Sequence, residues 1–120
     1  MAQYLPAFRP GDTVTFDATA AVVGGRLVEL GTADRSVAPA GAASVKVIGV
    51  AGHDAAVGDK VTVEVSKPID LVPCAAAVAR GAKVEAAAAG KVQTATTGQV
   101  FGIALSTTTA ADQLVYVLRF

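Results

Sequence analysis

The chain contains an internal repeat, and this feature limits its fold more than any other. Two stretches 53 residues apart share a glycine in a small apolar group, then an aspartate, then alternating apolar residues. These residues are Gly49, Asp59, Val61, Val63 and Val65 in the first stretch, and Gly102, Asp112, Leu114, Tyr116 and Leu118 in the second. Upstream, residues 20–29 similarly resemble residues 76–85. The sequence therefore predicts two copies of one β-rich unit, at about residues 14–65 and 70–118.

Short runs of β-branched residues, separated by Gly, Pro and Asp, predict many strands and almost no helix. The predicted strands cover residues 13–16, 26–30, 44–50, 61–65, 83–85, 99–105 and 114–120. Alternation is cleanest in residues 61–65, where three valines alternate with Thr62 and Glu64, as in a strand with one buried face. We expect an all-β fold, a small antiparallel barrel or sandwich built from two similar halves, forming a single domain over residues 11–120.

Two segments differ from this strand pattern. Residues 74–90 are rich in alanine, but Gly81 and Gly90 interrupt them, so we expect at most one short helix, around Ala75–Ala79. The small side chains of residues 75–79 and 86–89 would also permit close approach between subunits. The segment from Thr32 to Ala43, rich in Gly, Ala, Pro and Ser, predicts an exposed loop.

Glycines and aspartates at the predicted strand boundaries are assigned structural roles. Gly-Asp pairs precede two of the strands, where glycine permits positive φ and the Asp side chain can accept hydrogen bonds from backbone amides of the turn. The residues given such roles are Gly11, Asp12, Gly49, Gly58, Asp59, Gly81 and Gly102.

The first ten residues form an extended N-terminal arm in this interpretation. Pro6 and Pro10 prevent regular ladder pairing, while Tyr4, Leu5 and Phe8 are costly to leave in water. Two roles remain open for these side chains, and they are not exclusive. The arm binds a partner, or it folds back and closes one end of its own barrel.

Charge and hydropathy exclude several classes of partner. Ten basic and ten acidic residues give zero net charge, and the bases are scattered singly, so we expect no nucleic-acid binding. The N-terminus lacks a secretion signal, and apolar runs are too short for a membrane helix, which needs about 20 residues. We expect a soluble protein, made in the cytoplasm, with no membrane partner.

Catalytic and metal-binding residues are scarce. His53 is the only histidine, and with Asp54 and Asp59 it would make a weak cluster at best, so a polar connection between strands is the better interpretation. Cys74 is the only cysteine, has no cationic neighbour in sequence, and is expected to be a small buried residue. We expect no enzymatic activity, no catalytic residues, no metal and no cofactor.

The order of the turn and strand elements resembles the small capsid decoration, or cement, proteins of tailed bacteriophages. The similar elements span nearly the whole chain: residues 10–14, 22–28, 48–51, 54–65, 80–84 and 100–104.

This resemblance implies a structural virion protein that binds the outer surface of a capsid and stabilises the shell, commonly as a trimer. The implied partners are the major capsid protein and further copies of the chain, and the implied location is the capsid exterior. In this interpretation the arm makes the capsid contact, with Tyr4, Leu5 and Phe8 as anchors and Arg9 as an ionic partner. Two alternatives remain: a β-barrel module of a phage tail or baseplate, and a small-ligand-binding barrel.

Overall fold

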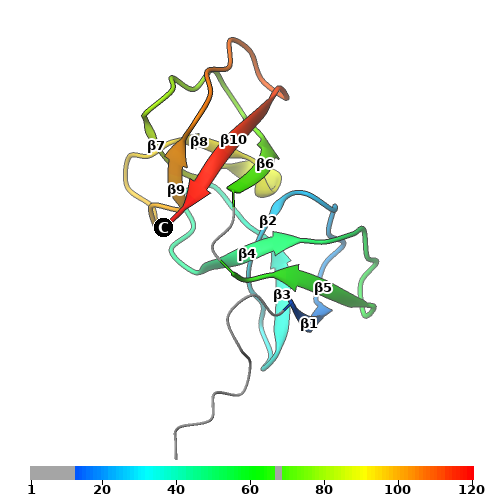
Figure 1. Cartoon of the computed structure of the whole chain (residues 1–120). Helices are drawn as coiled ribbons and strands as arrows, with labels where there is room; N and C mark the ends of the chain where they lie inside the picture. The colour runs from blue at the N-terminus through cyan, green and yellow to red at the C-terminus, as the bar shows by residue number, and fades with distance from the viewer. Residues whose placement is uncertain (1–12, 67–68) are drawn as a thin grey trace, which may run out of the picture.

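A computed structural model describes residues 13–66 and 69–120, so Gly11, Asp12 and the whole N-terminal arm lie outside the described part (Figure 1). The strands of the first half are β1 (Thr13–Ala18), β2 (Leu27–Leu30), β3 (Ser36–Pro39), β4 (Val47–Ala51) and β5 (Lys60–Glu64). Those of the second half are β6 (Ile69–Pro73), β7 (Lys83–Ala86), β8 (Val92–Thr94), β9 (Gly102–Ala104) and β10 (Leu114–Arg119). One 3-10 turn, η1 (Ala88–Gly90), precedes β8. The predicted all-β fold is confirmed.

The first half is a closed five-stranded barrel with the strand order β1-β3-β2-β4-β5. Four of its strand pairs are antiparallel, and β1 pairs with β3 in parallel to complete the ring. Alternation places Val61 and Val63 in the core and Thr62 and Glu64 on the outer side, as predicted. Closure leaves this half without a free sheet edge.

The second half is a five-stranded sheet with the corresponding order β6-β10-β9-β7-β8, and it is termed the second barrel because its two edges meet. Its two edge strands meet through an isolated parallel bridge between Cys74 and Val92, at the position where β1 meets β3 in the first half. Figure 1 shows the two halves as separate groups of strands, with β2 and β4 of the first half facing the second.

Hydrogen-bond registers match pair for pair between the halves. Val28 lies opposite Gly49 in the first half, and Val84 lies opposite Gly102 in the second. The same holds on the other side of each barrel, where the pair of β1 and β5 corresponds to the pair of β6 and β10. The repeat predicted from the sequence is therefore a duplication of the barrel itself.

One part of the predicted repeat alignment is wrong by a single residue. The last strand was aligned so that Leu114 and Tyr116 matched buried valines, but the buried apolar residues of β10 are Val115 and Val117. The turns before β5 and β10 explain the shift, because the positive-φ position is Gly58 in one and Asp112 in the other, 54 residues apart rather than 53. A one-residue shift moves every side chain of a strand to the opposite face.

Other departures from prediction concern short elements. Residues 36–39, expected within an exposed loop, form β3, with Ser36 and Val37 buried. No helix forms at Ala75–Ala79, and the only helical turn of the described residues is η1. Strands β6 and β8 were not predicted, since β6 is bounded by prolines and β8 has only three residues.

The second barrel's core extends into the first half. One cluster of buried side chains fills the first barrel, including Val37, Val61 and Val63. The other fills the second barrel and also contains Leu27, Ala40, Val47 and Val50 from β2, β4 and the segment between β3 and β4. Packing across the junction therefore buries the outer side of β2 and β4.

Polar contacts also link the two halves. Arg119 of β10 donates from Nη2 to the Glu64 carbonyl oxygen of β5 at 2.7 Å, and from Nε to the Asp70 carboxylate at 2.7 Å. The guanidinium carbon lies 5.3 Å from the centre of the Phe101 ring. The Gln99 side chain both accepts from the Val47 amide and donates to the Val47 carbonyl.

Candidate interaction surface

The predicted capsid-contact residues Tyr4, Leu5, Phe8 and Arg9 lie outside the described residues. Their assignment remains a prediction. Within the described residues the candidate surface is instead a group of exposed apolar side chains on the second barrel.

This surface, termed the β6–β10 face, is the outer side of β6 and β10 together with Leu105, which follows β9, and Phe120, which follows β10. Cross-strand pairing places Ile69 opposite Leu118 and Leu71 opposite Tyr116. Leu105 lies beside Tyr116, because its amide donates to the Tyr116 carbonyl. The β6–β10 face contains seven large side chains, each between 40% and 58% exposed: Ile69, Leu71, Leu105, Leu114, Tyr116, Leu118 and Phe120.

The matching side of the first barrel is polar. At the register positions of Leu71 and Tyr116, the first barrel has Thr15 and Thr62, which also lie opposite each other. The whole set of outward residues on β1 and β5 is Thr13, Thr15, Asp17, Lys60, Thr62 and Glu64. Asp17 and Lys60 form an exposed ion pair there. The same fold therefore forms with a hydrophilic surface at these positions.

Sequence reasoning missed the β6–β10 face, although one signal was present. Residues 114–118 are an unbroken apolar run, whereas residues 60–64 alternate between polar and apolar. A strand with apolar side chains in both directions is typical of burial on both faces. The misaligned repeat placed the outward residues of this run in the core and so hid the signal.

The structural glycines fall into two kinds. Gly49 and Gly102 occupy matching places against the neighbouring strand, and a Cβ at either would collide with a backbone carbonyl, that of Glu64 or of Leu118. Gly58 and Gly81 adopt positive φ, 86° and 89°, in exposed turns. Asp59 follows Gly58, and its carbonyl accepts from the Ala18 amide. At the four glycines the backbone geometry itself favours a residue without a side chain.

Glu85 is the only fully buried acidic residue in the described part of the chain, and it organises a loop. Its carboxylate accepts hydrogen bonds from the amides of Thr96, Thr97 and Gly98 and from the Gln93 side chain, at 2.8 to 3.1 Å. These bonds, that from the Thr96 amide above all, lower the pKa of Glu85 to about 2. Its counterpart in the repeat, Glu29, accepts from the Gly41 amide. Both carboxylates therefore hold loops in place.

His53 and Cys74 have structural partners. The His53 ring bonds the Asp54 carbonyl through Nδ1 and accepts from the Thr62 amide at Nε2, while the Asp54 carboxylate accepts from the Gly24 amide. Cys74 is buried, as predicted, and donates to Thr108. Across residues 13–66 and 69–120, no three His, Cys, Asp or Glu side chains are placed to hold a metal ion.

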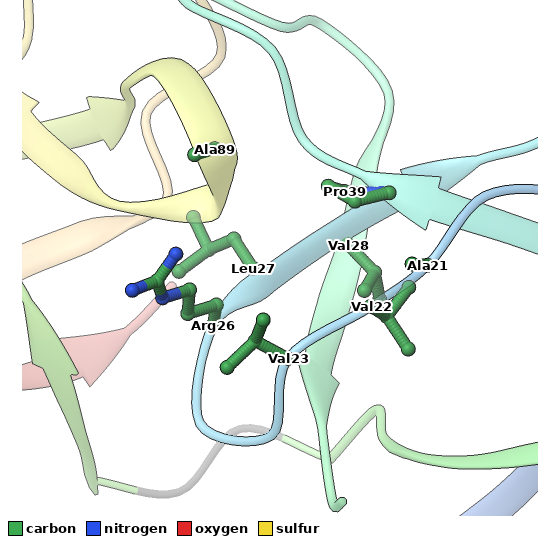
Figure 2. Close-up of a pocket in the computed structure, with 8 residues that line it drawn as sticks. All are labelled: Ala21, Val22, Val23, Arg26, Leu27, Val28, Pro39 and Ala89. Atoms are coloured by element: carbon green, nitrogen blue, oxygen red, sulfur yellow. The ribbon is translucent and has the colours of Figure 1, made fainter. Parts of the chain in front are cut away.

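A small apolar depression lies where the two halves meet. Figure 2 shows Val22 and Val23 from the turn before β2, Leu27 and Val28 of β2, and Ala89 of η1 around it. Its volume is about 130 Å³, well below the roughly 300 Å³ of the smallest usual ligand pockets. It offers room for a side chain of a partner rather than for a small-molecule ligand.

The small-residue segments 75–79 and 86–89 were expected to permit close approach between subunits, and this stays a prediction. Their exposed members are Ala76, Ala77, Ala79, Ala88 and Ala89. Ala86 and Ala87, by contrast, are 0% and 1% exposed, because they belong to the core of the second barrel.

No helix within the described residues is both long and apolar enough to span a membrane.

Comparisons with known proteins agree with this architecture. A family model described as phage cement protein matches residues 8–119. Among solved structures, the N base of the head fiber gp8.5 of bacteriophage phi29 is similar, with a TM-score of 0.76 and 21% sequence identity. The similarity covers 91% of this chain and 93% of the head fiber chain. No curated protein sequence matches the chain.

Proposed function

The chain belongs to the phage cement protein family, and on that basis we propose that it binds the outer surface of a phage capsid and stabilises the assembled shell. It is a structural protein associated with the phage capsid. In the proposal its direct partner is the major capsid protein, and it acts as a homo-oligomer, expected to be a trimer. It is made in the host cytoplasm and then added to the capsid exterior.

The family match over residues 8–119 is the observation that carries this proposal. It covers both barrels and includes Phe8 and Arg9 of the arm, so the resemblance is not confined to a generic β-barrel. The fold is consistent with a binding role, because two rigid barrels with a shared core present large fixed surfaces. Glu85, the fully buried acid of the described residues, accepts hydrogen bonds from a loop of the same chain, so its role there is structural.

The arm is the proposed capsid anchor. Tyr4, Leu5 and Phe8 supply aromatic and aliphatic groups of the type that dominates binding energy at interface centres, and Arg9 can pair with an acidic capsid residue. Several arms on one oligomer would bind together. Each contact can then be weak while the whole attachment is strong, because the later contacts form at high effective concentration.

Co-sedimentation of the purified protein with mature, expanded shells and with immature shells tests the proposal. Saturable binding to expanded shells, with a fixed number of copies per shell, is the expected result. The chain is added in molar excess over the capsid protein of the shells. Failure to sediment with either type of shell under this condition would contradict a role on the capsid surface. Bovine serum albumin serves as the control for trapped protein.

A further inference from the structure

We propose that the β6–β10 face is the surface through which copies of this chain associate with one another. The inference rests on the proposed function in one respect, since it locates the subunit interface of the proposed oligomer. Its evidence comes from the surface of the molecule itself, and it can be tested without capsids.

The repeat shows that the fold does not require this face to be apolar. Thr15 and Thr62 hold the positions in the first barrel that Leu71 and Tyr116 hold in the second, and both barrels form. The inward residues of β5 and β10 are alike, with Val61 and Val63 matching Val115 and Val117, whereas on β6 Asp70 stands at the position of Val14 and pairs with Arg119. The outward residues of these strands are hydrophilic in the first half and apolar in the second, and an exposed apolar patch of this kind indicates a contact outside the barrel.

The area of the face is sufficient for a stable interface. Seven large side chains about half exposed present on the order of 600 Å² of apolar surface, at the upper end of what a monomer usually leaves in water. Copies that converge through this face on a rotation axis would each bury on the order of 600 Å², so that two or more copies together bury about 1,200 Å² or more, which reaches the range of specific, stable protein interfaces. Neighbouring exposed residues such as Val100 can add to this area.

The charge distribution favours a second copy as the occupant. When copies converge on a rotation axis, equivalent side chains of each copy come close together, so like charges near the axis repel and an uncharged face is favoured. The seven side chains of the face carry no charge. The charged residues of β6 and β10, Asp70 and Arg119, point inward and bond each other, with side chains 10% and 4% exposed. Interfaces between identical subunits are also more apolar than interfaces that form transiently.

Association around a rotation axis would use the face symmetrically. Tyr116 is near the middle of the face, flanked by Leu71 and Leu105 on the adjacent strands. It provides the large, amphipathic side chain that is common at the energetic centre of interfaces, with a hydroxyl that can reach a polar partner. In a closed, symmetric oligomer each copy contributes its own Tyr116 to the interface.

The test exchanges residues between the two barrels. The double variant Leu71→Thr, Tyr116→Thr gives the second barrel the residues that the first has at these positions. A matched control, Leu30→Thr, Val57→Thr, removes two exposed apolar side chains elsewhere, 47% and 67% exposed in the wild type. Sedimentation equilibrium over a range of protein concentrations measures the mass of each protein without shells, and circular dichroism establishes that each is folded.

We expect the wild type and the control to associate at micromolar concentration, and the L71T/Y116T variant to remain folded with association at least about 30-fold weaker. Association of that variant with wild-type affinity would overturn the inference. So would a wild type that stays monomeric while the L71T/Y116T variant loses shell binding, because the face would then contact the capsid. Deletion of residues 1–9 should leave association intact; its loss would instead assign the arm as the occupant. If the wild type associates as expected but does not bind shells, the proposed function is contradicted while the interface remains supported.

Discussion

Tyr116 occupies the position in the second barrel that Thr62 occupies in the first. Tyr116 lies opposite Leu71 on β6, and Thr62 lies opposite Thr15 on β1. The two pairs sit in the same register of corresponding strand pairs, and the inward neighbours on β5 and β10 are valines in both halves: Val61 and Val63, and Val115 and Val117. On β5 and β10 the two halves therefore share core valines, while their outer sides differ in polarity.

The two halves also share a close contact between neighbouring strands, at Gly49 and at Gly102. We expect neither position to tolerate a side chain. Gly102→Ala would place a Cβ against the Leu118 carbonyl and the Val117 side chain. We expect it to lower the free energy of unfolding by about 2 kcal/mol, as other overpacked cores do. Denaturant unfolding measures the change.

Gly41→Ala is the control for that variant, because an added Cβ would have nothing within 4 Å and φ is not positive. It should change the free energy of unfolding by less than about 0.5 kcal/mol. Equal effects of the two substitutions would show that the close approach at Gly102 is not what limits this position.

Removing the charge of Asp70 should destabilise the junction between the barrels. Asp70→Asn would leave the Arg119 guanidinium, whose side chain is 4% exposed, without its carboxylate. Breaking one partner of a buried ion pair costs about 3 kcal/mol, and we expect that loss in thermal or denaturant unfolding.

Asp17→Asn provides a comparison at an exposed ion pair. Its partner Lys60 is 73% exposed, and such pairs contribute less than about 1 kcal/mol. A cost at Asp70 no larger than the cost at Asp17 would contradict a structural role for the Arg119 contacts.

Glu85 predicts a specific dependence of stability on acid. Its pKa is lowered from 4.5 to about 2 in the folded chain, so its contribution is complete above pH 4.5 and is lost as the pH falls from 4.5 toward 2. Glu85→Gln should unfold more easily at neutral pH, by about 1–3 kcal/mol, with a flatter stability curve over this acid range.

The matched variant for Glu85 is Glu29→Gln at the same position of the first barrel. Glu29 accepts from only one backbone amide, that of Gly41, and its side chain is 19% exposed. We expect a smaller loss of stability, below about 1 kcal/mol. The free energy of unfolding is measured against pH for the wild type and for E85Q. If it falls equally in both over the acid range, Glu85 is not the source of the acid sensitivity.

Deleting residues 1–9 should abolish shell binding and leave the barrels folded. In the part of the chain that the structure describes, pairing begins at Thr13, where β1 meets Glu64 of β5, so the deletion spares each strand described. Co-sedimentation with shells and circular dichroism are the two readouts. Loss of folding together with binding would mean that the arm completes the core instead of contacting the capsid.

Much of this fold follows from local patterns in the sequence. The alternation in residues 61–65 predicted which side chains of β5 are buried, and the duplicated Gly49 and Gly102 marked matching strands. The strand β3 was missed because its burial comes from pairing with β1 and β2, which are distant in the chain, and not from its own composition. Short strands in closed barrels depend on such long-range contacts.

The interaction surface was harder to predict than the fold. A single additional residue between Thr108 and Asp112 shifts β10 relative to the repeat, and counting from the sequence alone placed Leu114 and Tyr116 inside. Registers read from hydrogen bonds reverse that assignment and expose the face. The arm residues could be singled out only by composition, since no strand pattern connects them to the barrels.

The stability of the shell itself is the most direct test of a cementing role. Expanded, DNA-filled particles lacking this protein would be heated with and without the purified chain, and DNA release followed with an intercalating dye. We expect the added protein to raise the temperature of release in a saturable manner, and the chain lacking residues 1–9 to have no effect. Release at the same temperature with the surface saturated by bound protein would contradict the account.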